Sequence, residues 1–583
     1  MKKILWRVFH KKHDHRVVKQ IVETERDVKG IYVRQAPVFA VPSNGNKVTA
    51  LVDGEEAMCA IAEKIVQAKE IIYITDWQID PDVVLVRNKN HPLNGRTLVD
   101  LLKYAASNGV TIKVLLYNSP FFHDVAESGK KHYLLEQAHP NIECKEHRWM
   151  VAYTHHQKTV VVDHQIAFLG GLDLAHGRWD TNDHSLSPNA KSEGIPLFMP
   201  SDFYNTMVKV PEGEEANYPR LPWHDLHCMI EGPAVFDVDR NFVERWNRIT
   251  PIPEHLRLGH VPRGVGGMSI QIVRSICKDA GGNYHVERGC YEAVIRLINR
   301  AEDYVYIEQQ FFISNYGNDA IWNLVVSALA DKVIDAFKLQ KKFRVMIVLP
   351  AWSEGELQSI VVRSIMQLIK KTIFKGKLSL FARLTSTGIK QPSKYVGIFN
   401  LYSMGRTKTT GLTVSQIYVH SKCLIVDDRY VFISSANIND RSLIGERDTE
   451  IGAIVVDSNK ITTKMNGKFT KVNKFAFDLR TRLWGEHLGL LEYSFGMIED
   501  PVETIDSLII PTARQNTKIL EENFENYPSN AFTKFKDWKT HLYPKFIGNE
   551  KELVKFRGHI VEMPLDFGLE EGSSMSLGNI MVE

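Results

Sequence analysis

THHQKTVVVD, residues 154–163, places two histidines and a lysine directly before an apolar run and an aspartate directly after it. Residues two apart in a strand point to the same face, so His156 and Lys158 share a face. The apolar residues 159–162 are typical of a buried strand, and Asp163 begins the turn that follows. The stretch therefore predicts a buried strand that presents two polar side chains at its start.

The same pattern recurs in the second half of the chain as VHSKCLIVDD, residues 419–428. The two copies share the spacing His-x-Lys-x-x-x-x-Asp, which the second copy fills with His420, Lys422 and Asp427. Two small residues follow each copy at the same distance, as Gly170 and Gly171 and then as Ser434 and Ser435. Two copies with the same continuation indicate duplication rather than chance.

Other segments repeat in the same order. Residues 57–74 align without gaps with residues 290–307, and each reads as an amphipathic helix followed by an apolar strand. Residues 111–120 and 343–352 supply a second strand to each half. We therefore expect an α/β fold of two lobes, each a mixed sheet flanked by helices. The expected divisions are an N-terminal extension (1–45), a first catalytic lobe (46–262), a second catalytic lobe (263–500) and a C-terminal extension packed on the core (501–583).

The charge balance argues against a nucleic-acid partner. The 583 residues include 72 Lys and Arg against 69 Asp and Glu, a net charge of +3, whereas general nucleic-acid binders carry a clear basic excess. The six cysteines are scattered singly, without the spacing of a zinc site or a redox dithiol.

Neither a signal peptide nor a membrane-spanning helix is predicted. The basic start has too short an apolar run for a signal peptide, and no run of about 18 apolar residues follows. We expect synthesis in the cytoplasm, with any membrane contact peripheral. Signal-less secretion and a plain cytosolic enzyme fit this pattern equally well.

The paired residues suit phosphodiester exchange. A neutral imidazole can attack phosphorus, and a protonated one can give a proton to the leaving alcohol. Two lysines supply positive charge for the phosphoryl oxygens in the transition state. This chemistry needs no metal or other cofactor, and none is expected. The alternative is a structural role, which is the commoner one for a single histidine at a strand start.

At these residues the sequence resembles the phospholipase D superfamily, which is defined by paired His-Lys-Asp motifs. The likeness is closest to the phosphatidylcholine-cleaving branch and fits a compact bacterial member. It extends over roughly residues 50–490. The stretches that carry it are residues 154–163, 167–180, 222–247, 306–314, 419–442 and 446–452.

The resemblance implies a role for each matched residue. His156 would be the nucleophile and His420 the general acid and base. Lys158 and Lys422 would hold the phosphate, with Asn437 as a further donor to a phosphate oxygen. The two motif aspartates, Asp163 and Asp427, would tie the strand ends to their surroundings.

Three more residues are expected close to the histidines. Glu450 is expected to orient His156 from the other lobe, and Asp173 to orient His420. Ser435 is expected beside the phosphate site. The motif pair is nearly symmetric, so the pattern alone leaves open which histidine attacks.

The expected activity is hydrolysis of glycerophospholipids to phosphatidate and the head-group alcohol through a phosphohistidine. Primary alcohols would compete with water and give transphosphatidylation. A phosphatidyltransferase of the cardiolipin synthase type, a nuclease of the same superfamily and a lipid-binding scaffold remain as alternatives. The expected partner is a phospholipid membrane surface, and a secreted effector would also meet a secretion-system or immunity partner.

Overall fold

The computed structural model describes residues 30–568 apart from short gaps. The gaps are residues 35–37, 119–127, 149–153, 188–189, 193–194, 203–212, 215–216, 278–279, 281–284, 356–358, 535–537 and 539–542. All ten predicted site residues lie in the described part.

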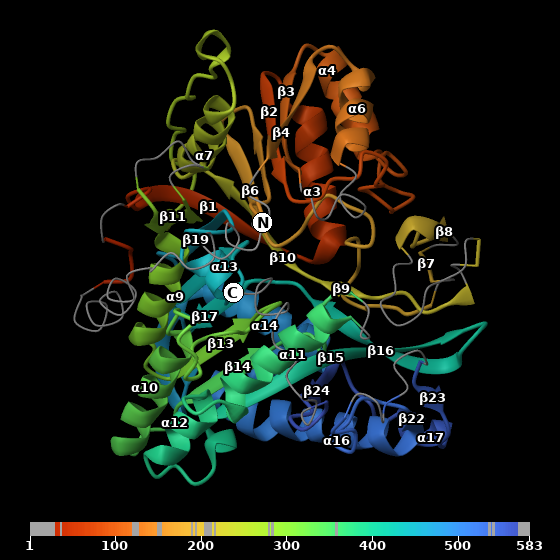
Figure 1. Ribbon diagram of the computed structural model, residues 1–583, viewed down its shortest axis with the longest axis vertical. Helices are drawn as coiled ribbons and strands as arrows, with labels where there is room; N and C mark the ends of the chain where they lie inside the picture. Colours follow the sequence, from red (N-terminus) through yellow and green to blue (C-terminus); the bar gives the residue numbers. More distant parts are fainter. Residues whose placement is uncertain are drawn as a thin grey trace, which may run out of the picture.

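The first lobe is a mixed sheet whose strands lie in the order β4-β3-β2-β5-β6-β10-β1 (Figure 1). The strands β2, β3 and β4 are parallel, and the rest of the order pairs antiparallel. Their bounds are β1 Ser43–Val52, β2 Ile71–Asp76, β3 Thr111–Asn118, β4 Ile142–Arg148, β5 Thr159–Val162, β6 Ile166–Gly170 and β10 Leu226–Glu231.

The second lobe repeats this order as β15-β14-β13-β17-β18-β19-β11, with the same parallel and antiparallel pairings. The bounds are β11 Met268–Ile276, β13 Tyr304–Glu308, β14 Arg344–Val348, β15 Val396–Thr407, β17 Cys423–Val426, β18 Tyr430–Ser434 and β19 Glu450–Val456. The strands β1 and β11 pair antiparallel, so the two sheets join. The predicted α/β fold with internal duplication is confirmed.

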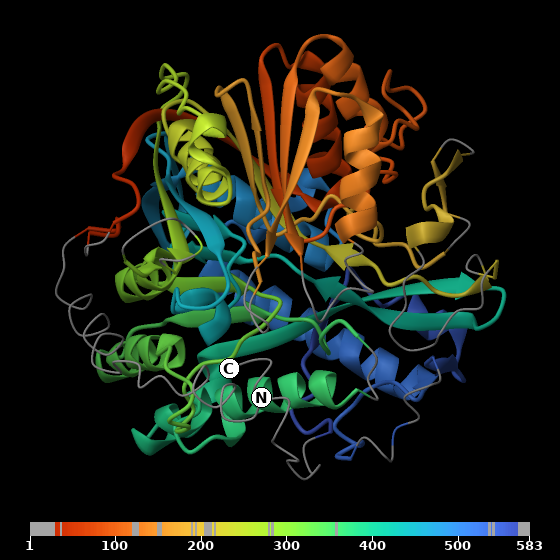
Figure 2. The same ribbon diagram turned by 45° about the horizontal axis from the view of Figure 1, so that its top comes forward.

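Helices cover both lobes (Figures 1 and 2). In the first lobe they are α3 Asp53–Gln67, α4 Leu98–Ser107, α6 Ser128–Ala138 and α7 Val235–Arg248. In the second they are α9 Gly289–Arg300, α10 Val325–Lys338, α11 Ile360–Lys370, α12 Leu380–Ser386, α13 Asp440–Leu443 and α14 Lys474–Leu488. Local sequence sets several ends: Thr97 and Asp100 form a capping box on α4, and Gly489 ends α14 in the left-handed region at φ 64°.

One hydrophobic core spans both lobes. It includes Tyr73 and Phe242 of the first lobe, whose rings stack at 4.6 Å, and Tyr306 and Trp484 of the second, which meet edge to face at 5.6 Å. In each pair a tyrosine of β2 or β13 meets an aromatic ring of α7 or α14. The same packing therefore recurs in the two halves and presses both sheets against a shared interior.

The C-terminal segment packs on the second lobe. Its helix α16 (Ile510–Asn523) lies against β24 (Ile560–Glu562), and β24 pairs antiparallel with β15. The strand β24 is the last element of the described part, and residues 569–583 lie outside it. Within the described residues, no helix has both the length and the apolar character needed to cross a membrane.

The remaining elements lie outside the two repeated strand orders. The strands are β7 Lys191–Ser192, β8 Ile195–Pro196, β9 Trp223–His224, β12 Glu287–Arg288, β16 Gly411–Val419, β20 Lys460–Met465, β21 Lys468–Asn473, β22 Phe524–Glu525 and β23 Lys545–Phe546. The short α-helices are α15 Pro501–Thr504 and α17 Glu550–Leu553. The 3₁₀ helices are Pro200–Asp202, Ile252–Glu254, Pro392–Lys394 and Glu492–Ile498, and the π-helical segments are Lys371–Lys375 and Ile505–Ile509.

Candidate active site

The two motif histidines line one cavity at the junction of the lobes. His156 comes shortly before β5, and His420 comes shortly before β17. The cavity has a volume of about 400 Å³, and its lining includes both histidines together with Asp173 and Asn437. The duplicated motifs therefore contribute to a single site.

His156 is held by a carboxylate of the opposite lobe. Its Nδ1 lies 3.0 Å from both carboxylate oxygens of Glu450, the first residue of β19, and 3.1 Å from the backbone oxygen of Ser435. Glu450 is fully buried and also accepts hydrogen bonds from the hydroxyls of Ser435 at 2.5 Å and Ser442 at 2.7 Å. The expected contact between Glu450 and His156 is present, and Ser435 reaches the site through Glu450.

His420 is held in the same way by Asp225, a residue that sequence reasoning did not single out. The Nδ1 of His420 lies 2.7 Å from Asp225 Oδ2, and Asp225 directly precedes β10 as Glu450 begins β19. The indole of Trp223 donates to the same carboxylate oxygen at 3.1 Å. The prediction that Asp173 orients His420 is wrong, because Asp173 pairs with a lysine instead. The signal was available in the duplication, since both orienting acids stand at the start of equivalent strands.

Burial favours the neutral form of His420. Desolvation, and then the nearby ammonium of Lys422, lower the pKa of His420 well below its ordinary value. With Nδ1–H directed at Asp225, the second ring nitrogen, Nε2, is left unprotonated. The ring is therefore fixed in one tautomer.

The two motif lysines have different surroundings. Lys158 forms a buried ion pair with Asp173 at 2.9 Å, whereas Lys422 donates to the side-chain oxygen of Gln310 at 3.0 Å and to the backbone oxygen of His420. Burial lowers the pKa of Lys422 to about 7. Positive charge at the second lysine therefore depends on pH near neutrality.

Equivalent residues, Asp76 at the end of β2 and Gln309 directly after β13, accept hydrogen bonds from the backbone. In the first lobe Asp76 accepts from Leu174 N at 2.9 Å, and in the second Gln309 accepts from Ile438 N at 3.2 Å. Burial, and then the charge of Asp173, raise the pKa of Asp76 well above its ordinary value.

The second lobe has an amide where the first has a carboxylate. Asn437 follows β18 as Asp173 follows β6, and it lines the cavity. Its Oδ1 is buried and has no hydrogen-bond partner. Asn437 is therefore placed where its amide can meet a ligand in the cavity, whereas Asp173 is occupied by Lys158.

The motif aspartates bind backbone, away from the cavity. Asp163 accepts from the N–H groups of Lys69, Glu70 and Ile71 at 2.7–3.1 Å. Asp427 accepts from those of residues 302–304 at 2.7–2.8 Å. Each carboxylate thus fastens the turn after one strand to the start of the neighbouring strand.

The cavity is apolar on one side and charged on another. Trp77, Phe311 and Ile365 contribute apolar surface. Arg178 stacks on the ring of Trp223 at 3.9 Å and pairs with Glu354 at 3.3 Å. Arg178 lies in the segment 167–180, but nothing in its local pattern marked it as a site residue.

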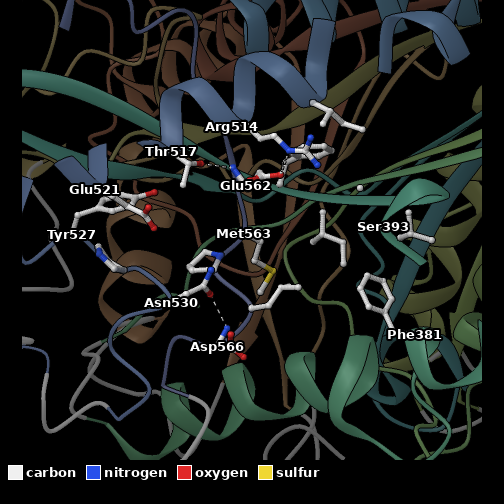
Figure 3. Close-up of a pocket in the computed structure, with 18 residues that line it drawn as sticks. Phe381, Ser393, Arg514, Thr517, Glu521, Tyr527, Asn530, Glu562, Met563 and Asp566 are labelled. Carbon is white, nitrogen blue, oxygen red and sulfur yellow. Dashed lines mark hydrogen bonds and ion pairs between the residues drawn. The ribbon is translucent and has the colours of Figure 1, made fainter. Parts of the chain in front are cut away.

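A second cavity, of about 250 Å³, lies between α16, β24 and the segment that joins them (Figure 3). Arg514 of α16 pairs with Glu562 of β24 at 3.1 Å, and Thr517 accepts from Glu562 N at 2.9 Å. None of the predicted site residues is among its described lining residues.

Comparisons with known proteins agree with the motif pattern. The phospholipase D family model matches residues 64–564. The chain is 31% identical to phospholipase D zeta 2 of Arabidopsis thaliana over 85% of its own length, and 30% identical to phospholipase D2 of Bos taurus over 93%. It spans 58% and 64% of those two relatives. A solved phosphatidylserine synthase of Haemophilus influenzae aligns over 76% of this chain and 87% of its own, at 14% identity and a TM-score of 0.43.

Proposed function

Because the chain belongs to the phospholipase D family, we propose that it cleaves the head-group phosphodiester of glycerophospholipids through a phosphohistidine. The products would be phosphatidate and the head-group alcohol. The observation that carries this proposal is the pair of imidazoles on one cavity, each with Nδ1 held by a buried carboxylate.

In the first step, His156 attacks phosphorus through Nε2. The nitrogen–phosphorus bond forms as the bond to the head-group oxygen breaks, and His420 as imidazolium gives its Nε2 proton to that oxygen. A bound phosphodiester anion favours the imidazolium form, since it adds negative charge beside a ring whose pKa burial lowers.

In the second step, neutral His420 takes a proton from water, and the hydroxyl oxygen attacks phosphorus. The nitrogen–phosphorus bond breaks, which releases phosphatidate and restores His156. A primary alcohol in place of water would give the transphosphatidylation product. Lys158, Lys422 and the amide of Asn437 supply the positive charge and the hydrogen bond that the phosphoryl oxygens need.

The lining of the cavity supports a lipid rather than a nucleic acid as substrate. Trp77, Phe311, Val361, Val362 and Ile365 form an apolar side, which suits acyl or glycerol carbons. A nuclease site would follow the substrate backbone with positive charge, and the chain has nearly equal numbers of acidic and basic residues. A phosphatidyltransferase remains the second candidate, because it would use the same intermediate with a larger alcohol as acceptor.

The activity is tested by incubating the purified chain with mixed phospholipid vesicles and ethanol, and measuring phosphatidylethanol by mass spectrometry. We expect the product with the wild type, its loss in His156→Ala and His420→Ala, and its retention in His260→Ala, an exposed histidine outside the cavity. The lipid that is consumed identifies the head group. Folded protein without product, but with nicking of plasmid DNA, would replace the lipase proposal with a nuclease.

The working location that follows from this proposal is a membrane surface, contacted peripherally. Within the described residues, no observation supports a secretion-system or immunity partner. The proposed partner is therefore the phospholipid membrane alone.

A further inference from the structure

Four side chains of the types that bind metal ions converge at a place outside the active-site cavity, and none of them takes part in the proposed phosphodiester chemistry. They are Asp53 at the start of α3, His184 in the connection after β6, His224 in β9 and Glu486 in α14. Their side chains are at most 4% exposed. The four come from segments far apart in the sequence, so they do not form a motif with the short sequence spacing that is typical of metal ligands.

The distances between the facing atoms resemble the edges of a metal coordination shell. His224 Nδ1 lies 2.9 Å from Asp53 Oδ1 and 3.0 Å from Glu486 Oε1. His184 Nε2 lies 3.1 Å from Glu486 Oε1 and 3.6 Å from Asp53 Oδ2. Ligand atoms about 2.0–2.1 Å from a tetrahedral Zn²⁺ are separated by roughly 3.3 Å.

We propose that Asp53, His184, His224 and Glu486 bind a divalent transition-metal ion, with Zn²⁺ as the best match. Two imidazole nitrogens and two carboxylate oxygens form a ligand set that suits Zn²⁺. The site is closed, which is typical of a structural ion rather than a catalytic one.

The ring nitrogens of His184 and His224 that point away from Asp53 and Glu486 already have carboxylate partners. His184 Nδ1 lies 3.2 Å from Asp180 Oδ2, and His224 Nε2 lies 3.2 Å from Glu308 Oε2. Metal-binding histidines usually donate their second N–H to such an acceptor, which turns the unprotonated nitrogen toward the ion. Here the inner nitrogens are the ones that face Asp53 and Glu486.

Hydrogen bonds alone satisfy this cluster poorly. A single N–H at His224 Nδ1 would face two carboxylate oxygens, of Asp53 and Glu486, at nearly equal distance. Asp53 Oδ2 is buried and has no hydrogen-bond partner. Asp53 and Glu486 together bring two negative charges into the interior, and one divalent cation balances both.

The outer carboxylates have cations or donors of their own. Asp180 pairs with Arg220 at 2.8 Å, and Glu308 accepts from the hydroxyl of Ser421 at 2.7 Å and contacts His487 Nε2 at 2.9 Å. The outer carboxylates therefore have partners besides the two histidines.

A metal here would join the two lobes. Asp53 and His224 come from the first lobe, and Glu486 comes from the last long helix of the second. His224 also accepts a backbone hydrogen bond from His420 N at 2.8 Å and directly precedes Asp225. The ion would thus support the wall that carries one orienting carboxylate without touching the substrate.

The full chain is tested by expression in zinc-supplemented medium, extensive dialysis and elemental analysis. We expect about one Zn²⁺ per chain, a lower melting temperature after treatment with 1,10-phenanthroline, and recovery on adding ZnCl₂. Replacement by Co²⁺ should give the visible absorption of a tetrahedral site. Wild-type protein that stays metal-free and melts at the same temperature with and without ZnCl₂ would overturn the proposal.

Variants locate the ion. His184→Gln and Glu486→Gln should lose the metal, whereas His164→Asn, which alters a separate histidine–aspartate pair at 3.1 Å, should keep it. His487→Gln should also keep it, although His487 belongs to an overlapping cluster with His224 and Glu308. Retention in His184→Gln together with loss in His487→Gln would contradict the assignment. If the first two variants do not fold, the metal content of the wild type decides.

Discussion

Asp225 Oδ2 lies 2.7 Å from Nδ1 of His420 and belongs to the other lobe. The relation is reciprocal, because Glu450 of the second lobe holds His156 of the first at 3.0 Å. Each imidazole is therefore oriented by a carboxylate across the lobe junction. Neither lobe contains a complete site, which explains why the duplicated halves must pack together.

Asp225→Asn should lower kcat for phospholipid cleavage by about 100-fold or more. The amide can turn its NH₂ group toward Nδ1, which would favour the wrong tautomer, with the proton on Nε2 instead of Nδ1. Steady-state kinetics on vesicles measure the effect. Asp82→Asn is the matched control, since Asp82 lies 3.0 Å from His176 on the surface and should leave kcat within twofold. An Asp225→Asn enzyme with wild-type kcat would contradict the orienting role.

Gly171→Ala should reduce activity through Asp225. A Cβ at Gly171 would overlap Asp225 Oδ1 and lie 3.0 Å from the backbone oxygen of His420. The carboxylate must then move, and we expect kcat to fall by about 10-fold or more. In Gly496→Ala the added methyl meets open space, so that variant should match the wild type. Equal kcat in both variants would show that Asp225 tolerates displacement.

The pH profile of kcat/KM should have an alkaline limb near neutrality. Burial lowers the pKa of Lys422 to about 7, so the free enzyme loses this ammonium as pH rises through that value. The neutral amine attracts a phosphodiester anion less, and kcat/KM should fall toward about a tenfold loss per pH unit. In Lys422→Arg, whose guanidinium stays charged, this limb should disappear although the absolute rate is lower. A wild-type profile flat to pH 9 would exclude the assignment.

Asp427→Asn should cost stability rather than chemistry. The carboxylate accepts three backbone N–H groups of residues 302–304, and an amide oxygen can replace only part of this. We expect a loss of about 1–3 kcal/mol in the free energy of unfolding, measured by urea denaturation, with kcat of the folded enzyme changed less than fivefold. Asp163→Asn should cost less, because two of its three donors lie at an exposed turn. A large kcat loss at unchanged stability would argue for a direct catalytic role.

The fold and the motif residues could be predicted from the sequence because the same motif occurs twice in the chain. His156 with Lys158, and His420 with Lys422, stand at fixed spacing before apolar strands, and strand periodicity then places each pair on one face. The helix–strand repeats at residues 57–74 and 290–307 predicted the duplicated α/β architecture, which the structure confirms. The expected contact between Glu450 and His156 is also present.

The partner of His420 was missed, although the duplication offered a signal in the equivalent places of Asp225 and Glu450 at the starts of β10 and β19. The prediction chose Asp173 because it occupies the place of Asn437, but Asp173 is held by Lys158 at 2.9 Å. Which carboxylate reaches His420 depends on how the first lobe, with Asp225 directly before β10, packs against the second, and no local pattern encodes that distance.

The sequence by itself determined the duplicated α/β lobes, the family and the motif residues, since periodicity and spacing act within a few residues of the chain. Only the tertiary structure decided which acid orients His420, how the two lysines differ and that Asp53, His184, His224 and Glu486 converge. These relations join segments that lie far apart in sequence. They depend on the packing of one lobe against the other and on the burial that shifts pKa values there.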